Sequence, residues 1–169
     1  MYGAINRTSK RSTGAALNRV ACAFFFGLTL LLAQNQEPLV GVWQLNLARS
    51  TFPSGPQLYA RLTCTIEPWQ DGLKVTYDIV GVRGGVTHWE WQGRLDGKDY
   101  PLQGVDEVTT NAYTRLDALT YGVVTKLDGR MASSTRIVIS PDGRTMTVTG
   151  AAATPQGQAA LNTAIYDKR

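Results

Sequence analysis

The sequence has few of the residues from which disulfides and metal sites are built. Its 169 residues include two cysteines, Cys22 and Cys64, and one histidine, His88. Because only Cys64 lies beyond the first 33 residues, the rest of the chain cannot form an internal disulfide. One histidine and one cysteine outside any ligand cluster predict no metal site. We expect Cys64 to be a small buried side chain in a strand, with a reactive thiol as the alternative.

Acidic side chains are absent from the first 33 residues. Four basic residues lie in this segment, and it ends in an apolar run from Val20 to Ala33. That run is too short for a helix that crosses a bilayer, which needs about 20 residues. A basic segment followed by a short apolar run is typical of a signal peptide. We therefore predict a signal peptide over residues 1–33, a mature domain over 34–169 that begins between Gln34 and Glu37, a periplasmic or secreted location, and no lasting membrane span.

Residues 34–169 also lack an excess of basic charge. The chain has 17 basic and 13 acidic residues, and removal of the four basic residues before position 34 leaves 13 of each sign. A nucleic-acid-binding domain normally carries a clustered basic surface. We therefore expect no nucleic-acid partner, and the sequence indicates no particular oligomeric state. The length of residues 34–169 matches one ordinary domain with its own core.

Helical periodicity is missing from residues 34–169, whereas the alternation typical of strands is common. Apolar Leu73, Val75 and Tyr77 alternate with polar residues, which predicts a strand with one apolar face. Asp-Gly or Gly-Gly pairs, which favour tight turns, separate such stretches at 71–72, 84–85, 96–97, 128–129 and 142–143. Strands are predicted near 40–48, 58–68, 73–81, 86–95, 99–103, 111–117, 119–127, 130–140, 144–152 and 158–168.

Long antiparallel strands joined by tight turns favour a sheet that closes on itself, because closure removes exposed edges. We predict an all-β fold, an antiparallel up-and-down β-barrel of eight to ten strands. A two-sheet sandwich with Greek-key links is the alternative. Residues 49–56, which contain Pro53, Gly55 and Pro56, interrupt the pattern and predict a loop at one end of the barrel.

The segment Thr87-His88-Trp89-Glu90-Trp91 places His88 and Glu90 on one face and the two tryptophans on the other. We expect the indoles to face inward, because burial of large apolar rings is favourable and burial of charge is not. The reverse facing would bring an imidazole and a carboxylate into the interior, where they could serve acid-base chemistry. The sequence shows no pattern of an activated nucleophile. We therefore expect no catalytic residue, no cofactor and no enzyme.

Large rings with a polar tip recur on the predicted strands and suit contact with a mostly apolar guest. We predict that the protein binds a small apolar or amphipathic molecule, with residues 49–56 at the entrance. The alternative is a structural or interaction protein of the cell envelope whose barrel is packed by its own side chains. A cavity of roughly 300 Å³ or more would favour the binding protein. The candidate ligand-binding residues are Tyr77, Trp89, Trp91, Tyr113 and Tyr121.

Gly41-Val42-Trp43, at the start of the first predicted strand, resembles the Gly-x-Trp element of the lipocalin-like (calycin) barrels. The resemblance implies that the tryptophan packs across one end of the barrel against a basic residue near the last strand. Lys168 or Arg169 is in the position to do so, with its cation over the indole face.

Beyond this element, the chain resembles a group of uncharacterised exported bacterial proteins with a lipocalin-like barrel. That resemblance implies the fold and no particular activity. The well-studied lipocalins have a disulfide pair and a helix after the barrel, and this sequence offers neither, so their ligand specificity is not carried over. The resembling stretches are residues 41–46, 87–90, 96–101, 115–118 and 142–148.

Overall fold

The structure, a computed structural model, describes residues 37–53, 59–153 and 159–169. These residues belong to one compact unit over Gln34–Arg169. The predicted signal peptide, residues 1–33, lies outside the described residues, as do residues 34–36 and the part of the predicted 49–56 loop after Pro53. None of the described residues forms a helix long and apolar enough to cross a membrane.

Ten β-strands and one short 3-10 helix are found in the described residues. The helix, η1 (Leu47–Arg49), follows the first strand. Each strand coincides with one of the ten predicted segments, with boundaries that differ by a few residues. The strands are β1 (Gly41–Leu45), β2 (Tyr59–Trp69), β3 (Gly72–Gly81), β4 (Val86–Gly93), β5 (Tyr100–Gln103), β6 (Thr109–Arg115), β7 (Thr120–Leu127), β8 (Arg130–Ile139), β9 (Thr145–Ala153) and β10 (Ala159–Lys168).

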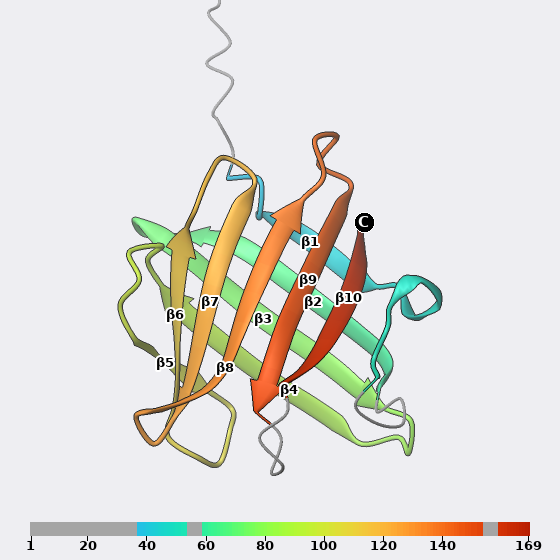
Figure 1. Ribbon diagram of the computed structural model, residues 1–169, viewed down its shortest axis with the longest axis horizontal. Coiled ribbons are helices and arrows are strands. Elements are labelled where there is room, and N and C mark those ends of the chain that lie inside the picture. The colour runs from blue at the N-terminus through green and yellow to red at the C-terminus, as the bar shows by residue number, and fades with distance from the viewer. Residues whose placement is uncertain (1–36, 54–58, 154–158) are drawn as a thin grey trace, which may run out of the picture. The chain divides into compact units, whose positions relative to one another are not determined.

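The ten strands form one closed antiparallel sheet (Figure 1). Each strand pairs with the next along the chain, and β1 also pairs with β10, through Trp43 and Lys168 among others. The predicted up-and-down barrel is therefore confirmed, and the alternative of a two-sheet sandwich is wrong. Closure gives both long edges of the sheet a partner, so no edge strand is left to recruit another chain.

The core of the barrel is built from inward-facing rows of apolar side chains. Ile66 of β2, Val75 of β3 and Trp91 of β4 stand beside one another in the register of the sheet, and each is 2% exposed or less. This row follows directly from the alternation in the sequence, because side chains two residues apart share a face. The same alternation turns Lys74 and Glu90 outward, where they form an ion pair of 2.7 Å.

The turns follow the glycine pairs at 84–85, 128–129 and 142–143, whereas Asp96 of the pair at 96–97 forms a β-bridge with Thr114. Asp128 and Gly129 both have positive φ, 48° and 75°, as a two-residue hairpin turn of type I′ requires. The pair at 71–72 was expected to form a turn, but the positive φ belongs to Gln70 and Gly72 is the first residue of β3. A Cβ on Gly72 would lie 2.1 Å from the carbonyl oxygen of Gly93. Gly72 is thus explained by close contact between strands rather than by the turn.

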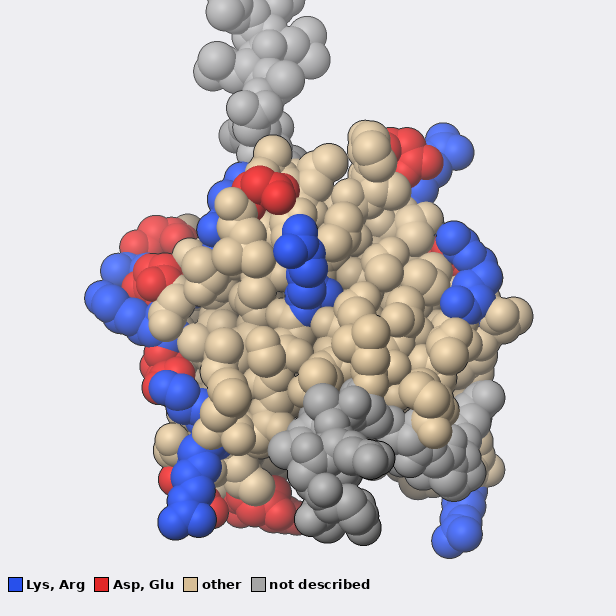
Figure 2. Space-filling view, viewed as in Figure 1, with Lys and Arg blue, Asp and Glu red and all other residues tan. Residues whose placement is uncertain are grey.

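The charged side chains are distributed unevenly over the face shown in Figure 2. Lys, Arg, Asp and Glu gather at its rims, while its centre, over β7 to β9, is largely uncharged. Some opposite charges are paired, as in the ion pairs of Lys126 with Asp99 at 2.6 Å and of Arg94 with Asp71 at 2.7 Å. Exposed pairs of this kind contribute little to stability.

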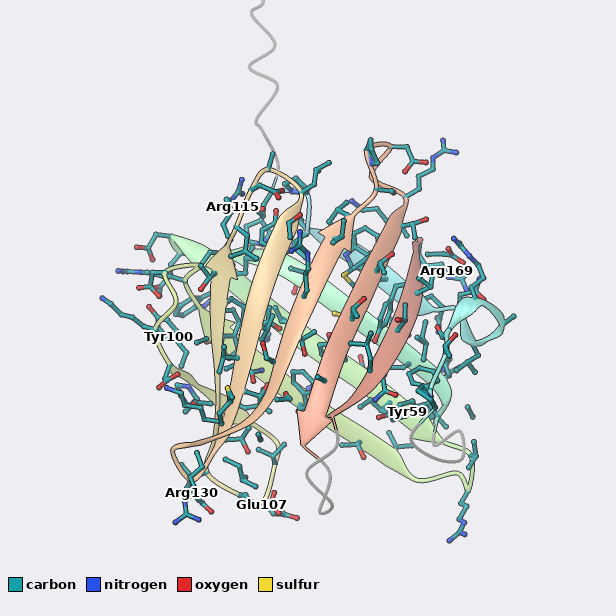
Figure 3. All side chains as sticks on the ribbon, viewed as in Figure 1. Tyr59, Tyr100, Glu107, Arg115, Arg130 and Arg169 are labelled. Atoms are coloured by element: carbon teal, nitrogen blue, oxygen red, sulfur yellow. The ribbon has the colours of Figure 1, made fainter. Side chains whose placement is uncertain are left out.

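The two ends of the barrel differ. One end, called here the closed end, holds Leu39, Trp43 and the hairpin turns at 70–71 and 140–144. The other, called the distal end, includes the hairpin tips at 82–85, 104–108 and 128–129. Figure 3 shows Arg115 near the closed end, and Glu107 and Arg130 at the distal end. The fully buried side chains lie toward the closed end, so any space for a guest lies in the distal half of the interior.

Candidate functional site

Trp43 seals the closed end. Its indole is fully buried, and its Nε1 donates a hydrogen bond of 2.8 Å to the carbonyl oxygen of Leu39. The Nζ atom of Lys168 lies 5.0 Å from the centre of the indole ring, within the range of a cation–π interaction. The contact that the Gly-x-Trp resemblance implies is therefore confirmed, with Lys168 as the basic residue.

Gly41 makes this contact possible. A Cβ at this position would lie 2.4 Å from Cε of Lys168, and the residue has a φ of 148°, which favours glycine. The glycine of the Gly-x-Trp element therefore leaves the space through which the lysine side chain reaches the indole. Its role is to form the end of the barrel rather than to bind a ligand.

Tyr121, a candidate ligand-binding residue, belongs to the same closed end. Its side chain is fully buried, and its hydroxyl donates a hydrogen bond to the carboxylate of Glu37. Arg115 forms an ion pair with that carboxylate, and its guanidinium lies 5.6 Å from the Tyr121 ring centre. Burial is the main cause that raises the pKa of the Tyr121 phenol. This cluster fastens the residues before β1 to the barrel and leaves the Tyr121 hydroxyl engaged.

Trp91 and Tyr113, two further candidates, pack against each other in the core. Their ring centres are 4.3 Å apart at an interplanar angle of 37°, and both side chains are buried. Trp91 Nε1 donates a hydrogen bond of 3.0 Å to the carbonyl oxygen of Asn111. Tyr100 also packs against Trp91 in a T-shaped arrangement, with ring centres 5.9 Å apart. Trp91 is thus held on several sides and acts as a core residue.

Tyr77 and Trp89, the remaining candidates, form a stacked pair. Their ring centres are 4.0 Å apart with an interplanar angle of 18°, and they face each other in register on β3 and β4. Both side chains are only half-buried. The five candidates therefore all lie on inward-facing positions but split into three groups, and Tyr77 and Trp89 are the two that are half-buried rather than buried.

A cavity of about 220 Å³ lies against β8, β9 and β10. Small side chains line it, and none of the five aromatic candidates is among them. Large rings do not mark this cavity; its signal in the sequence is a set of inward positions filled by serine, threonine, glycine and alanine. The lining residues are Ser133, Thr135, Val148, Gly150, Ala151, Asn162 and Ala164.

His88 and Glu90 lie on the outer face of the barrel. His88 Nδ1 is 2.7 Å from a carboxylate oxygen of Asp78, and both side chains are more than half exposed. The hydrogen bond from Lys74 to Glu90 is the main cause that raises the pKa of Lys74. The tryptophans therefore face inward as expected, and the alternative in which an imidazole and a carboxylate enter the interior is wrong.

Cys64 faces the interior from β2. It is fully buried with a free thiol, and burial raises its pKa to about 12. Because the thiolate is the reactive form, this thiol is unreactive at neutral pH. The prediction of a small buried side chain is confirmed. No group of three or more His, Cys, Asp or Glu side chains in the described ranges is placed to hold a metal ion.

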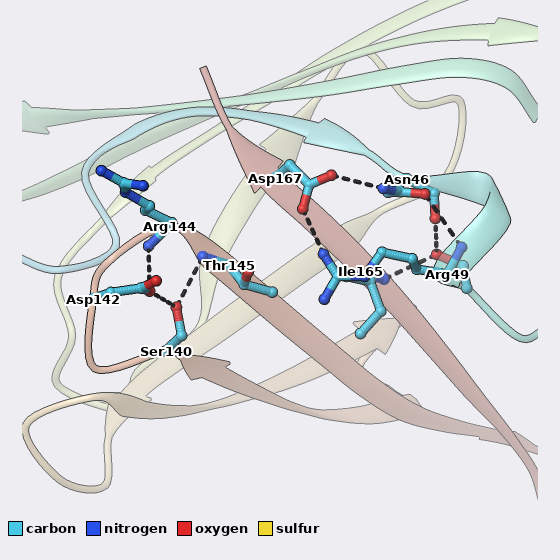
Figure 4. Close-up of polar contacts among 9 residues, drawn as sticks. Asn46, Arg49, Ser140, Asp142, Arg144, Thr145, Ile165 and Asp167 are labelled. Atoms are coloured by element: carbon cyan, nitrogen blue, oxygen red, sulfur yellow. Dashed lines mark hydrogen bonds and ion pairs between the residues drawn. The ribbon is translucent and has the colours of Figure 1, made fainter.

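A second, more polar hollow of about 320 Å³ lies outside the barrel, beside the end of β1 and the last residues of β10. Asp167 accepts hydrogen bonds there from Asn46 Nδ2 at 2.7 Å and from Arg49 at 2.8 Å (Figure 4). These contacts fasten η1 to β10. Both oxygens of the Asp167 carboxylate already accept hydrogen bonds. The polar groups of this hollow therefore serve to attach η1 to β10, and we do not assign a ligand to it.

The chain matches no protein-family model, and no curated protein is significantly similar to it. The site is therefore interpreted from its own geometry.

Proposed function

We propose that this protein is an exported binding protein for a small apolar or amphipathic molecule, held in the distal half of a lipocalin-like barrel. The observation that carries the proposal is that two opposite sides of the barrel interior differ: one side is lined by small side chains and the other carries aromatic rings. β8 and β9, with the cavity of about 220 Å³, stand across the ring of strands from β3 and β4, with the Tyr77–Trp89 stack. A cavity opposite an accessible aromatic surface suits a mostly apolar guest.

Export to the periplasm or the exterior is part of this proposal. It is supported by the basic and apolar composition of residues 1–33. Glu37 is already bonded into the closed end, which suits a cleavage before that residue.

The alternative of a structural envelope protein with a packed barrel is also supported by specific observations. The cavity is smaller than the roughly 300 Å³ at which typical ligand sites begin. Three of the five aromatic candidates, Trp91, Tyr113 and Tyr121, are core residues. The two functions differ in whether the interior accepts a guest, which a titration decides.

The mature protein should bind Nile red or an isoprenoid alcohol in a saturable manner, followed by dye fluorescence and tryptophan emission. For a guest that fits, we expect a dissociation constant of about 10 μM, which corresponds to a binding free energy of about −7 kcal/mol. Trp89→Ala should weaken binding about tenfold, because it removes one ring of the accessible stack.

Trp69→Ala is the matched control. Trp69 lies at the closed end of β2, at an outward-facing position, so its loss should leave the affinity unchanged. Absence of saturable binding by any apolar compound would contradict the binding function and favour the packed barrel.

We also propose that the protein is not an enzyme and that His88 has no catalytic role. His88→Ala should leave the fold and any ligand affinity nearly unchanged, because the imidazole lies on the outer face, where it is bonded to exposed Asp78. The measurement is a denaturation curve together with the Nile red titration. If this substitution abolished a reproducible activity found by substrate screening, the enzyme interpretation would replace ours.

A further inference from the structure

Three tyrosines and Cys64 approach one another inside the barrel from four strands. Tyr77 lies on β3, Tyr113 on β6 and Tyr166 on β10, and Cys64 on β2 is the register partner of Tyr77. Burial is the main cause that raises the pKa of each tyrosine, and the nearby Cys64 raises all three further. The groups are therefore close enough to interact, and the phenols stay protonated as hydrogen-bond donors at neutral pH.

Two of these hydroxyls, those of Tyr113 and Tyr166, have no hydrogen-bond partner among the described residues. Tyr113 is 3% exposed and Tyr166 is 5% exposed. In the described part of the chain neither hydroxyl makes a hydrogen bond, whereas the hydroxyl of Tyr121 is bonded to Glu37. No side-chain oxygen or nitrogen of the described residues is both sealed from solvent and without a partner. The Tyr113 and Tyr166 hydroxyls must therefore be in contact with accessible space. Hydroxyls that are nearly buried normally have a hydrogen-bond partner, so a water molecule or a guest is expected to accept from them.

The cavity lies next to this cluster. Ala164, which lines it, is two residues before Tyr166 on the same face of β10, and Val148 of β9 is the register partner of Ala164. A guest in the cavity would thus contact the residue next to Tyr166 on the inner face of β10. Ser133 and Thr135 add hydroxyls to the cavity lining.

Charge is nearly absent from this interior. Among the described strands, the inward-facing positions that carry a charged residue are Arg115 and Lys168 at the closed end and Arg130 at a distal hairpin tip. Arg115 is paired with Glu37, and Lys168 lies over Trp43. An ionised group on a guest would therefore lose its water without gaining an opposite charge, which is unfavourable.

We infer that the interior selects a neutral guest with a hydrogen-bond acceptor, such as a ketone or ester carbonyl, which accepts from the hydroxyls of Tyr113 and Tyr166. This inference rests on the proposed binding function and names the chemical class of its ligand. The guest must gain both from burial of its apolar part and from the two hydrogen bonds, since the phenols alone would also bind water.

The test is a matched series of four small compounds titrated against the mature protein by NMR: toluene, acetophenone, benzoate and benzylammonium. Acetophenone should bind at least about tenfold more tightly than benzoate or benzylammonium. In the double variant Tyr113→Phe, Tyr166→Phe, acetophenone should bind about fivefold more weakly, while toluene should change less than about twofold. Tyr100→Phe is the control, because its hydroxyl is bonded to Asp96 at 3.1 Å and the ring is kept.

Each outcome bears on a different claim. The inferred ligand class is wrong, while the binding function stands, in either of two cases. In the first, the double substitution changes the affinities for toluene and acetophenone by the same factor. In the second, benzoate binds as tightly as acetophenone. If none of the four compounds and no Nile red binds, the binding function itself fails. Circular dichroism and the denaturation midpoint of the double variant establish that it is folded, since no protein hydrogen bond is lost.

Discussion

Replacement of Trp43 with alanine is expected to lower the free energy of unfolding by about 3 to 5 kcal/mol, as for other buried aromatic truncations. The indole is fully buried, bonded to Leu39 and covered by Lys168. Its removal leaves a cavity at the closed end, an unpaired carbonyl and a lysine without its aromatic surface. Urea denaturation followed by circular dichroism provides the measurement.

Trp69→Ala is the control for Trp43, because Trp69 is an outward-facing and only half-buried tryptophan. Its loss should cost less than half as much. A loss below about 1 kcal/mol for Trp43→Ala would mean that the closed end does not depend on this residue, and the resemblance to the lipocalin-like barrels would then mislead.

The second large effect is expected at Trp91. Trp91→Ala should also destabilise the protein by about 3 to 5 kcal/mol, because its side chain is fully buried and packs against Tyr113 and Tyr100. The substitution also leaves the carbonyl of Asn111 without its donor.

Trp89→Ala is the matched comparison for Trp91, since Trp89 lies two residues earlier on the same face of β4 and is half-buried. It should cost about 1 to 2 kcal/mol and mainly weaken ligand binding. Equal losses of stability for the two variants would contradict the division between a packed closed half and an accessible distal half.

Local pattern was enough to predict the strands and the direction of their side chains. The alternation around Val75 and the Asp128-Gly129 turn each depend on neighbouring residues only, so both can be predicted from the sequence. The Trp43–Lys168 contact joins the first strand to the last, and a resemblance was needed to predict it. The confirmed inward facing of Trp89 and Trp91 follows from the cost of burying charge, which is also a local argument.

Position along the barrel axis could not be predicted from the sequence. Trp89 and Trp91 have the same local pattern, yet one is half-buried and the other fully buried, because the stagger of neighbouring strands decides which row each joins. For the same reason the cavity beside Ala164 was not foreseen, since its lining comes from three strands. The role of Gly72 could not be predicted either, because its contact with Gly93 on the next strand is not visible in the sequence.

The central claim is that a small guest occupies the distal half of the interior, and isotope-filtered NOE spectra of the mature protein with bound toluene test it most directly. We predict cross-peaks from toluene to the methyl groups of Val148 and Ala164, which line the cavity, and to the ring of Trp89 on the facing wall. Cross-peaks confined to exposed methyl groups on the outside of the barrel, such as those of Leu161, would contradict the account.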